Sequence, residues 1–326
     1  MPRLPPPSLS PCIHLPLAVT SLSMPPPPNT QPPAPSPQLI QRTAEMLGHT
    51  PHSWRPAPGG WTLAQRWIVQ FPDRPPAFLK IAVNPLTALW LRAEHKVYTA
   101  LSIPSVPRLL GFSDDGRQPI LALEDLSHAA WPPPWTARMV QSVLLAMADV
   151  RCAIVPLRLV NVLSERQQLM RWRHIARNPA PFLSLKLCTP AWLEKTLPRL
   201  IEAEAAAILD GNDFLHGDLK TGNICFRDGQ CLLIDWNWAC RGNGLLDIVT
   251  WLPGLHQQGG PPPQSVLPSQ GALAALMAGY TAFYAAQPDP PQVPNLRLNQ
   301  LNTLKYALPW VCHELALPLP DLLPTP

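Results

Sequence analysis

The sequence constrains its fold most strongly between residues 216 and 247, where acidic and amide side chains surround two short apolar runs. The runs 224–226 and 231–234 are separated by the turn-like sequence Arg-Asp-Gly-Gln. A short turn of this kind between two apolar runs predicts a β-hairpin. Asn223 enters the first strand and Asp235 leaves the second, so we expect the open end of the hairpin to bring these two side chains together.

A second carboxylate, that of Asp218, lies in the loop directly before this hairpin. Asp and Asn are common turn formers when they occur singly. Here the three residues Asp218, Asn223 and Asp235 occur in the order in which kinases use an aspartate, an asparagine and a second aspartate. Hard oxygen ligands hold Mg²⁺, and a further carboxylate orients the attacking hydroxyl in phosphoryl transfer. The segment therefore predicts phosphoryl-transfer chemistry.

The stretches HGDLKTGN (216–223) and LIDW (233–236) resemble the catalytic loop and the metal-binding motif of one superfamily. That superfamily contains the aminoglycoside phosphotransferases and the choline kinase-like enzymes. The resemblance implies that Asp218 is the catalytic base and that Asn223 and Asp235 are the Mg²⁺ ligands.

Two further residues of this segment are implied to support the catalytic loop. Asp247 matches the later aspartate of the family, which braces the loop and does not touch the substrate. His216 is expected to pack in a similar supporting role.

The resemblance also predicts a nucleotide site in the N-terminal half of the chain. A kinase-like fold carries a lysine on a strand, and this lysine pairs with the phosphates and with a glutamate on the next helix. Lys80 lies in the apolar stretch 78–83, and Glu94 lies within the helical pattern 87–101. We therefore expect Lys80 and Glu94 to form an ion pair beside the phosphates of ATP, with GTP as an alternative.

Other expected nucleotide contacts come from three places. The stretch 121–126 resembles the hinge between lobes, whose backbone would bind adenine, and the glycines near residue 60 would cover the nucleotide although a GxGxxG motif is absent. Lys220 would meet the γ-phosphate. The positions expected to bind the nucleotide are Lys80, Glu94, Leu123, Glu124, Asp125, Gly59, Gly60 and Lys220.

The overall pattern predicts an α+β, two-lobed protein kinase-like fold. Residues 39–124 are expected to form a small β-rich lobe, and residues 125–326 a larger, mainly helical lobe. Of the first 40 residues, 14 are proline, so we expect residues 1–38 to be a disordered proline-rich leader. The expected strands lie at 61–71, 78–83 and 118–123, and the expected helices at 87–101, 136–151, 190–210, 271–286 and 296–308.

The composition narrows the expected partners and location. The net charge of +4 is spread along the chain without a run of Lys or Arg, so we expect no nucleic-acid partner. No apolar stretch reaches the roughly 18 residues of a membrane span. The seven cysteines include no CxxC pair, which favours reduced thiols in a cytoplasmic protein. The oligomeric state is open.

Two alternatives to a small-molecule kinase remain. A protein kinase is disfavoured because Gly217 stands where protein kinases carry the Arg of His-Arg-Asp. In addition, only eleven residues separate Asp235 from Asp247, which leaves no room for a long activation segment. A non-catalytic nucleotide-binding protein is disfavoured because the lysine, glutamate, aspartate and asparagine of the predicted site are all present.

The acceptor is expected to be a small molecule with a hydroxyl group, such as an amino-alcohol, a sugar or an antibiotic-like compound. Aminoglycoside-modifying relatives need a pocket rich in carboxylates. Residues 248–326 contain only Asp289, Glu314 and Asp321 as acids, which disfavours an aminoglycoside.

Overall fold

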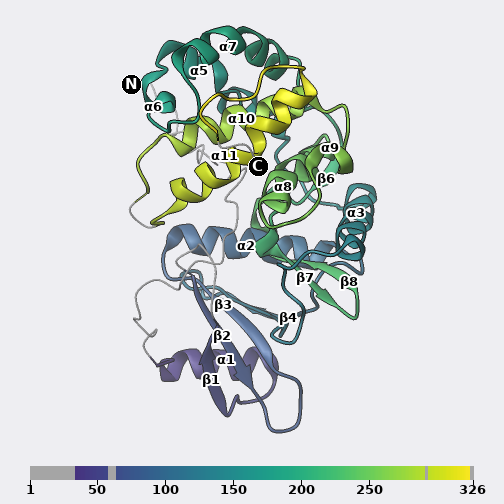
Figure 1. Ribbon diagram of the computed structural model, residues 1–326. Helices are drawn as coiled ribbons and strands as arrows, with labels where there is room; N and C mark the ends of the chain where they lie inside the picture. Colours follow the sequence, from purple (N-terminus) through teal and green to yellow (C-terminus); the bar gives the residue numbers. More distant parts are fainter. Residues whose placement is uncertain (1–33, 58–63, 291–292, 324–326) are drawn as a thin grey trace, which may run out of the picture.

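A computed structural model describes residues 34–57, 64–290 and 293–323 of the chain. The molecule has two lobes: a smaller lower lobe, which contains a β-sheet and two helices, and a larger helical lobe above it (Figure 1). Helix α2 (Pro85–Ala100) runs across the boundary between them. The predicted α+β, protein kinase-like fold is therefore confirmed.

The small lobe is built on one antiparallel sheet of five strands in the order β1-β2-β3-β5-β4. Side chains alternate between the two faces of a strand. Trp67, Val69, Leu79 and Ile81 point to one face, where they form a core with Leu39 of helix α1. The strands are β1 (Ser53–Pro56), β2 (Gln65–Gln70), β3 (Ala77–Ile81), β4 (Leu109–Ser113) and β5 (Ile120–Glu124), and α1 spans Pro37–Leu47.

The alternation in β3 places Lys80 on the face of the sheet away from α1. Helix α2 supplies the partner for this face. It begins with a capping box between Asn84 and Thr87, and it buries one side that includes Leu91, Glu94 and Val97. The local sequence therefore sets the start of α2, and the spacing of its buried residues turns Glu94 inward.

The helical lobe holds two short β-ribbons beneath a bundle of helices. Strand β7 (Ile224–Arg227) pairs with β8 (Gln230–Leu233), and β6 (Asp213–Leu215) pairs with β9 (Cys240–Gly242). The longer helices are α3 (Ala137–Cys152), α7 (Pro190–Ala205), α8 (Leu245–Gln257), α10 (Gly271–Ala285) and α11 (Leu296–Glu314). The short ones are α4 (Arg166–Leu169), α5 (Trp172–Arg177), α6 (Ala180–Leu183) and α9 (Pro263–Val266), with 3₁₀ turns η1 (Val162–Glu165), η2 (Thr221–Asn223) and η3 (Trp236–Trp238).

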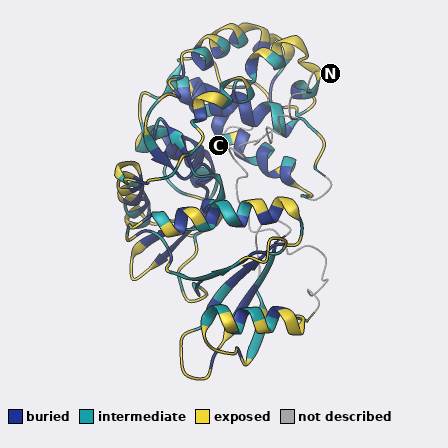
Figure 2. Ribbon diagram, turned by 180° about the vertical axis from the view of Figure 1, so that it is seen from behind, coloured by how far each residue is buried: buried dark blue, intermediate teal, exposed yellow. Residues whose placement is uncertain are grey.

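Buried residues gather inside the helical lobe and along the strands, whereas the helix α1 at the bottom keeps an exposed side (Figure 2). Helices α8 and α10 are buried along most of their length. No helix in the described ranges combines the length and the apolar character needed to cross a bilayer.

Several elements differ from the sequence-based expectation. The strands β1, β4, β6 and β9 and the helices α1 and α8 were not predicted, nor were the short helices α4, α5, α6 and α9. Helix α7 ends at Ala205 instead of 210, and α11 continues to Glu314 instead of ending at 308. Helix α1 begins at Pro37, inside the segment expected to be a leader, because Ser36 caps its first turn. Residues 1–33 of that expected leader lie outside the described residues.

Candidate active site

The β7–β8 hairpin brings Asn223 and Asp235 together, as predicted. Ile224 is paired with Leu233 at the open end of the ribbon. The amide of Ile234 then donates to the carbonyl oxygen of Asn223 at 3.0 Å. Asp235 follows with φ of 65°, a left-handed conformation that Asp tolerates better than most residues. This turn ends the strand directly before η3.

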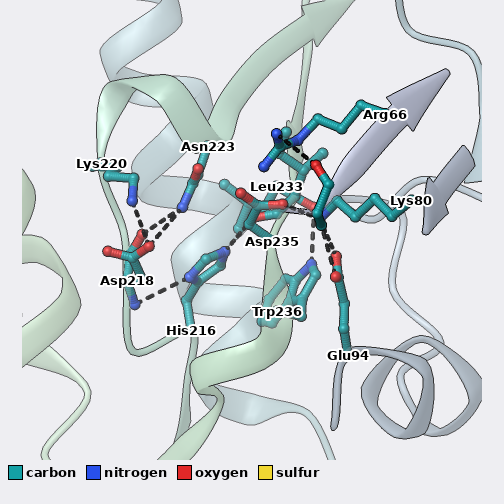
Figure 3. Close-up of polar contacts among 12 residues, drawn as sticks. Arg66, Lys80, Glu94, His216, Asp218, Lys220, Asn223, Leu233, Asp235 and Trp236 are labelled. Carbon is teal, nitrogen blue, oxygen red and sulfur yellow. Dashed lines mark hydrogen bonds and ion pairs between the residues drawn. The ribbon is translucent and has the colours of Figure 1, made fainter. Parts of the chain in front are cut away.

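Asp218 is buried beside the same end of the hairpin. Its Oδ2 accepts a hydrogen bond from Lys220 Nζ at 2.6 Å and one from Asn223 Nδ2 at 3.2 Å (Figure 3). Its Oδ1 is also buried and has no hydrogen-bond partner among the described residues. Burial raises the pKa of Asp218 to about 6, although the nearby Lys220 ammonium acts in the opposite direction.

Asp247 and His216 hold the loop that carries Asp218. Asp247, in the first turn of α8, accepts hydrogen bonds from the backbone amides of His216 at 2.7 Å and Gly217 at 2.9 Å. The His216 Nε2 lies 2.8 Å from the carbonyl oxygen of Ile234, and its Nδ1 lies 3.3 Å from the amide of Asp218.

Only a neutral His216 ring that donates from Nε2 and accepts at Nδ1 satisfies both of these bonds. Burial lowers the pKa of His216 to about 4, which agrees with the neutral form. The ring also lies 4.4 Å from the buried ring of Trp236. His216 therefore ties the loop to the end of β8 without carrying charge.

Gly217 is required by the same packing. Its φ of 79° is in the left-handed region, and a Cβ there would collide with the carbonyl oxygen of Trp238. An arginine at this position would need the backbone to move. The departure from the His-Arg-Asp pattern of protein kinases thus has a steric cause in this chain.

The structure joins Lys80 to two carboxylates. Lys80 Nζ lies 2.7 Å from Glu94 Oε1 and 3.0 Å from Glu94 Oε2, and it also contacts Asp235 Oδ1 (Figure 3). Burial alone would lower the pKa of Lys80, but the charges of Asp235 and Glu94 outweigh it and raise this pKa. In turn, Lys80 and Arg66 overcome the effect of burial on Asp235 and hold its pKa below the usual value. Lys80 and Asp235 are therefore both charged.

Arg66 is a member of this cluster that sequence reasoning missed. It lies on β2 directly opposite Lys80 in the antiparallel register, so both side chains leave the same face of the sheet. Its charge acts on Asp235 and on Glu94. The only charged residue of the strand Gln65–Gln70 was the available signal.

The predicted hinge lies at the end of β5. Leu123 is buried, and the side chain of Glu124 binds Arg227 at 2.7 Å and the backbone amide of Arg108 at 3.0 Å. The side chain of Asp125 accepts hydrogen bonds from Ser127. Both carboxylates therefore bind other groups of the protein, and only the backbone of this segment is available to contact a nucleotide. Gly59 and Gly60 lie outside the described residues.

The oxygen donors near Asp218 fit a magnesium ion that is shared with phosphates. The described residues contain no group of three or more His, Cys, Asp or Glu side chains arranged to hold a metal ion. Mg²⁺ is commonly bound by only one or two protein groups together with water and substrate phosphates. The Nδ2 of Asn223 is engaged with Asp218, so Oδ1 faces the other way (Figure 3). That oxygen and the charged Asp235 carboxylate form a suitable donor set.

The two-lobed fold, the lysine–glutamate ion pair and the aspartate-bearing loop define a kinase-like phosphotransferase. Comparison with known protein families gives the same class: the model of the phosphotransferase enzyme family (APH) matches residues 53–293. The chain therefore belongs to this phosphotransferase family.

Solved structures with the same fold include three small-molecule kinases. A spectinomycin phosphotransferase bound to ADP and spectinomycin has a TM-score of 0.54 and 15% identity, over 84% of this chain and 94% of that one. An amicoumacin kinase with AMP-PNP and Ca²⁺ has a TM-score of 0.52 and 10% identity, over 81% and 92%. A choline/ethanolamine kinase family protein from Mesorhizobium loti has a TM-score of 0.52 and 15% identity, over 86% and 94%.

Among curated proteins, a probable bifunctional tRNA threonylcarbamoyladenosine biosynthesis protein from Methanoculleus marisnigri is similar over a short segment. The two sequences are 48% identical over 46 residues, which is 14% of this chain and 9% of that protein. A match of this length says nothing about the function of the whole chain.

Proposed function

We propose that the protein transfers the γ-phosphate of ATP to a hydroxyl group of a small molecule, with Asp218 as the catalytic base. The observation that carries the proposal is the asymmetry of the Asp218 carboxylate. Its Oδ2 is held by Lys220 and Asn223, whereas the buried Oδ1 has no partner among the described residues. A buried acceptor without a partner is unfavourable by about 1–3 kcal/mol, so an acceptor hydroxyl that donates to Oδ1 would be bound and oriented at once.

The transfer would proceed in line. The acceptor hydroxyl donates its proton to Asp218 Oδ1 while its oxygen forms a bond to the γ-phosphorus. The bond between the γ-phosphorus and the β,γ-bridging oxygen breaks, and ADP leaves with that electron pair. A base with a pKa of about 6 is mostly ionised at neutral pH and remains able to take up the proton.

The charged groups around Asp235 would position the nucleotide. Asn223 and Asp235 would hold Mg²⁺, which neutralises phosphate charge when it is bound. Lys80, kept in place by Glu94, would contact the phosphates, and Arg66 would add charge on the same face. Lys220 would meet the γ-phosphate, and the backbone at Leu123, Glu124 and Asp125 would bind adenine. Gly59 and Gly60 would cover the phosphates.

The similar structures support the choice of substrates. The spectinomycin phosphotransferase holds ADP and a small-molecule substrate, and the amicoumacin kinase holds AMP-PNP with a divalent cation. A protein substrate is disfavoured because the packing at Gly217 excludes the arginine that anchors a phosphorylated activation loop. GTP remains the alternative phosphate donor.

The proposal is tested by a metabolite screen. The purified full-length protein is incubated with Mg²⁺, ATP and pools of hydroxylated compounds, and each pool is analysed by mass spectrometry for an added phosphate. We expect a phosphorylated product whose rate of formation falls by at least about 100-fold with Asp218→Asn. Nucleotide binding without any phosphorylated product would support a non-catalytic nucleotide-binding protein instead.

A further inference from the structure

A cluster of two arginines and two aromatic residues lies in the helical lobe, outside the groups assigned above. Arg171 precedes α5, Phe283 and Tyr284 lie in the last turn of α10, and Arg297 lies in the first turn of α11. The guanidinium carbon of Arg171 lies 4.8 Å from the Phe283 ring centre and 5.3 Å from that of Tyr284. Arg297 lies 5.4 Å from the Tyr284 ring centre, on a helix that packs along α10 (Figure 1). Tyr284 thus joins the two arginines.

This arginine cluster is connected to Asp218 through α8 and α10. Helix α8 carries Asp247, which binds the catalytic loop, and Thr250 one turn later, whose Oγ1 lies 3.5 Å from Met277 Sδ of α10. Tyr280 follows Met277 by one turn on the same side of α10, and its ring lies 4.6 Å from that of Tyr284.

The charged groups that act on Tyr280 also connect the arginines with Asp218. Burial raises the pKa of Tyr280, Tyr284 and Asp218 raise it further, and the charges of Arg171 and Arg297 lower it. The charges of the proposed base and of both arginines therefore all act on Tyr280.

The charges of the two arginines are not matched by carboxylates. Within the described residues, neither Arg171 nor Arg297 has a carboxylate oxygen within salt-bridge distance of its guanidinium group. Arg171 donates to the hydroxyl of Tyr284 at 2.9 Å, and its buried Nε has no partner. Arg297 donates to Gln300 Oε1 at 2.8 Å and to the carbonyl oxygen of Pro288 at 3.2 Å.

The carboxylates near the two arginines accept hydrogen bonds from backbone amides and do not bind the guanidinium groups. Glu204, whose pKa is raised to about 7 by burial against the opposing charge of Arg171, accepts hydrogen bonds from the backbone amides of Arg171 and Trp172. Asp289 accepts from the backbone amides of Asn295 and Arg297. The other two acids of the C-terminal segment, Glu314 and Asp321, bind Gln270 and Thr189.

We infer that the acceptor of this phosphotransferase carries an oxyanion, a carboxylate or a phosphate group, which Arg171 and Arg297 bind. This inference rests on the proposed function. The planar guanidinium group of Arg presents parallel donors that match the two oxygens of such a group. The Phe283 and Tyr284 rings and the hydrogen bond to the Tyr284 hydroxyl restrain the Arg171 side chain, so little side-chain entropy is lost on binding. The same two charges repel a cationic amine.

The charge class is tested with hexoses that share one skeleton. Glucuronate, glucose 1-phosphate, glucose and glucosamine, together with a metabolite library sorted by net charge, are incubated with the full-length protein, Mg²⁺ and ATP. Product masses identify each phosphorylated compound. We expect products only from compounds that carry an oxyanion, and glucuronate against glucose 1-phosphate separates the carboxylate from the phosphate.

Two other outcomes overturn the inference in distinguishable ways. Products only from neutral or cationic compounds would contradict the anionic acceptor and leave the proposed phosphotransferase intact. The absence of any product in every charge class would contradict the proposed function, and the inference would fall with it.

Variants test the two arginines on the anionic acceptor that the screen identifies. Arg171→Gln and Arg297→Gln should each raise the KM of that acceptor about 10- to 100-fold, as expected for the loss of a charge-assisted hydrogen bond. The KM of ATP should change less than about threefold. Arg199→Gln removes an exposed charge on α7 and serves as the matched control. Unchanged acceptor KM in both variants, with melting temperatures like that of the wild type, would contradict the assignment.

Discussion

The two clusters of cations differ in how their charge is balanced. Lys80 lies between the carboxylates of Glu94 and Asp235, with Arg66 across the strand (Figure 3). Arg171 and Arg297 lie instead against aromatic rings, with no carboxylate in salt-bridge distance within the described part of the chain. A buried charge is stable only when it is paired or hydrogen-bonded. The charges of the first cluster therefore balance within the protein, whereas the positive charge of the two arginines is left for a ligand to neutralise.

This difference assigns different tasks to the two clusters. We infer that the paired cluster positions a nucleotide and its metal ion in a fixed geometry, and that the arginine cluster selects the acceptor. Asp218 would act between the two substrates.

The largest expected effect comes from substitution of Asp218, the proposed catalytic base, which belongs to neither cluster. Asp218→Asn keeps the side-chain shape but removes the base, so kcat should fall by about 10²- to 10⁴-fold. The affinity for Mg²⁺–ATP should stay within about threefold. Transfer assays and titration calorimetry measure the two quantities, with the exposed Asp149→Asn on α3 as control. Full activity of Asp218→Asn would show that another group is the base.

A change in the paired cluster should weaken the nucleotide site alone. Asp235→Ala removes a metal ligand and one partner of Lys80, so the affinity for Mg²⁺–ATP should fall at least about tenfold. The affinity for ATP measured in EDTA should change much less. Titrations with and without Mg²⁺ give this contrast. An unchanged Mg²⁺–ATP affinity would rule out the metal role of Asp235.

Because Lys80 is paired with Glu94, removal of the Glu94 charge should lower the free energy of unfolding. Removing one partner of a buried ion pair typically destabilises a protein by about 3–5 kcal/mol. Lys80 keeps Asp235 as a partner in Glu94→Gln, so we expect a loss of about 1–3 kcal/mol in the free energy of unfolding. Urea denaturation measures it, and the exposed Glu45→Gln on α1 should change it by less than about 0.5 kcal/mol. Equal effects of both substitutions would argue against a tightly paired cluster.

The smallest effect is the dependence of transfer on pH. Burial raises the pKa of Asp218 to about 6, with Lys220 opposing and Asp235 reinforcing the shift. Because the base acts in its ionised form, kcat should be halved near pH 6 and should fall about tenfold for each further pH unit. The residual activity of Asp218→Asn should lack this acidic limb. A wild-type profile that stays flat down to pH 5 would contradict the assignment.

The hairpin, the catalytic loop and the lysine–glutamate pair could be predicted because each depends on residue type and short spacing. Asn223 and Asp235 flank two apolar runs, and the hairpin that these runs form brings them together. Lys80 and Glu94 lie in consecutive elements, so the strand and helix periods orient both side chains.

Features that depend on distant segments could not be predicted in the same way. Arg66 joins Lys80 only through the β2–β3 register, and the arginine cluster assembles from the segment before α5 and from α10 and α11. Helix α8 was missed because Pro253 and Gly254 disfavour helices. Its burial in the helical lobe stabilises it despite this propensity.

The most direct test of the central claim follows the γ-phosphate itself. The full-length protein is mixed with Mg²⁺, the acceptor found in the screen and ATP labelled in its γ-phosphate, and the label and ADP are counted over time. We predict that labelled acceptor and ADP appear in equal amounts, that both form at least about 100-fold more slowly with Asp218→Asn, and that neither forms without Mg²⁺. ADP formation with the label released only as inorganic phosphate, or nucleotide binding without turnover, would contradict the account.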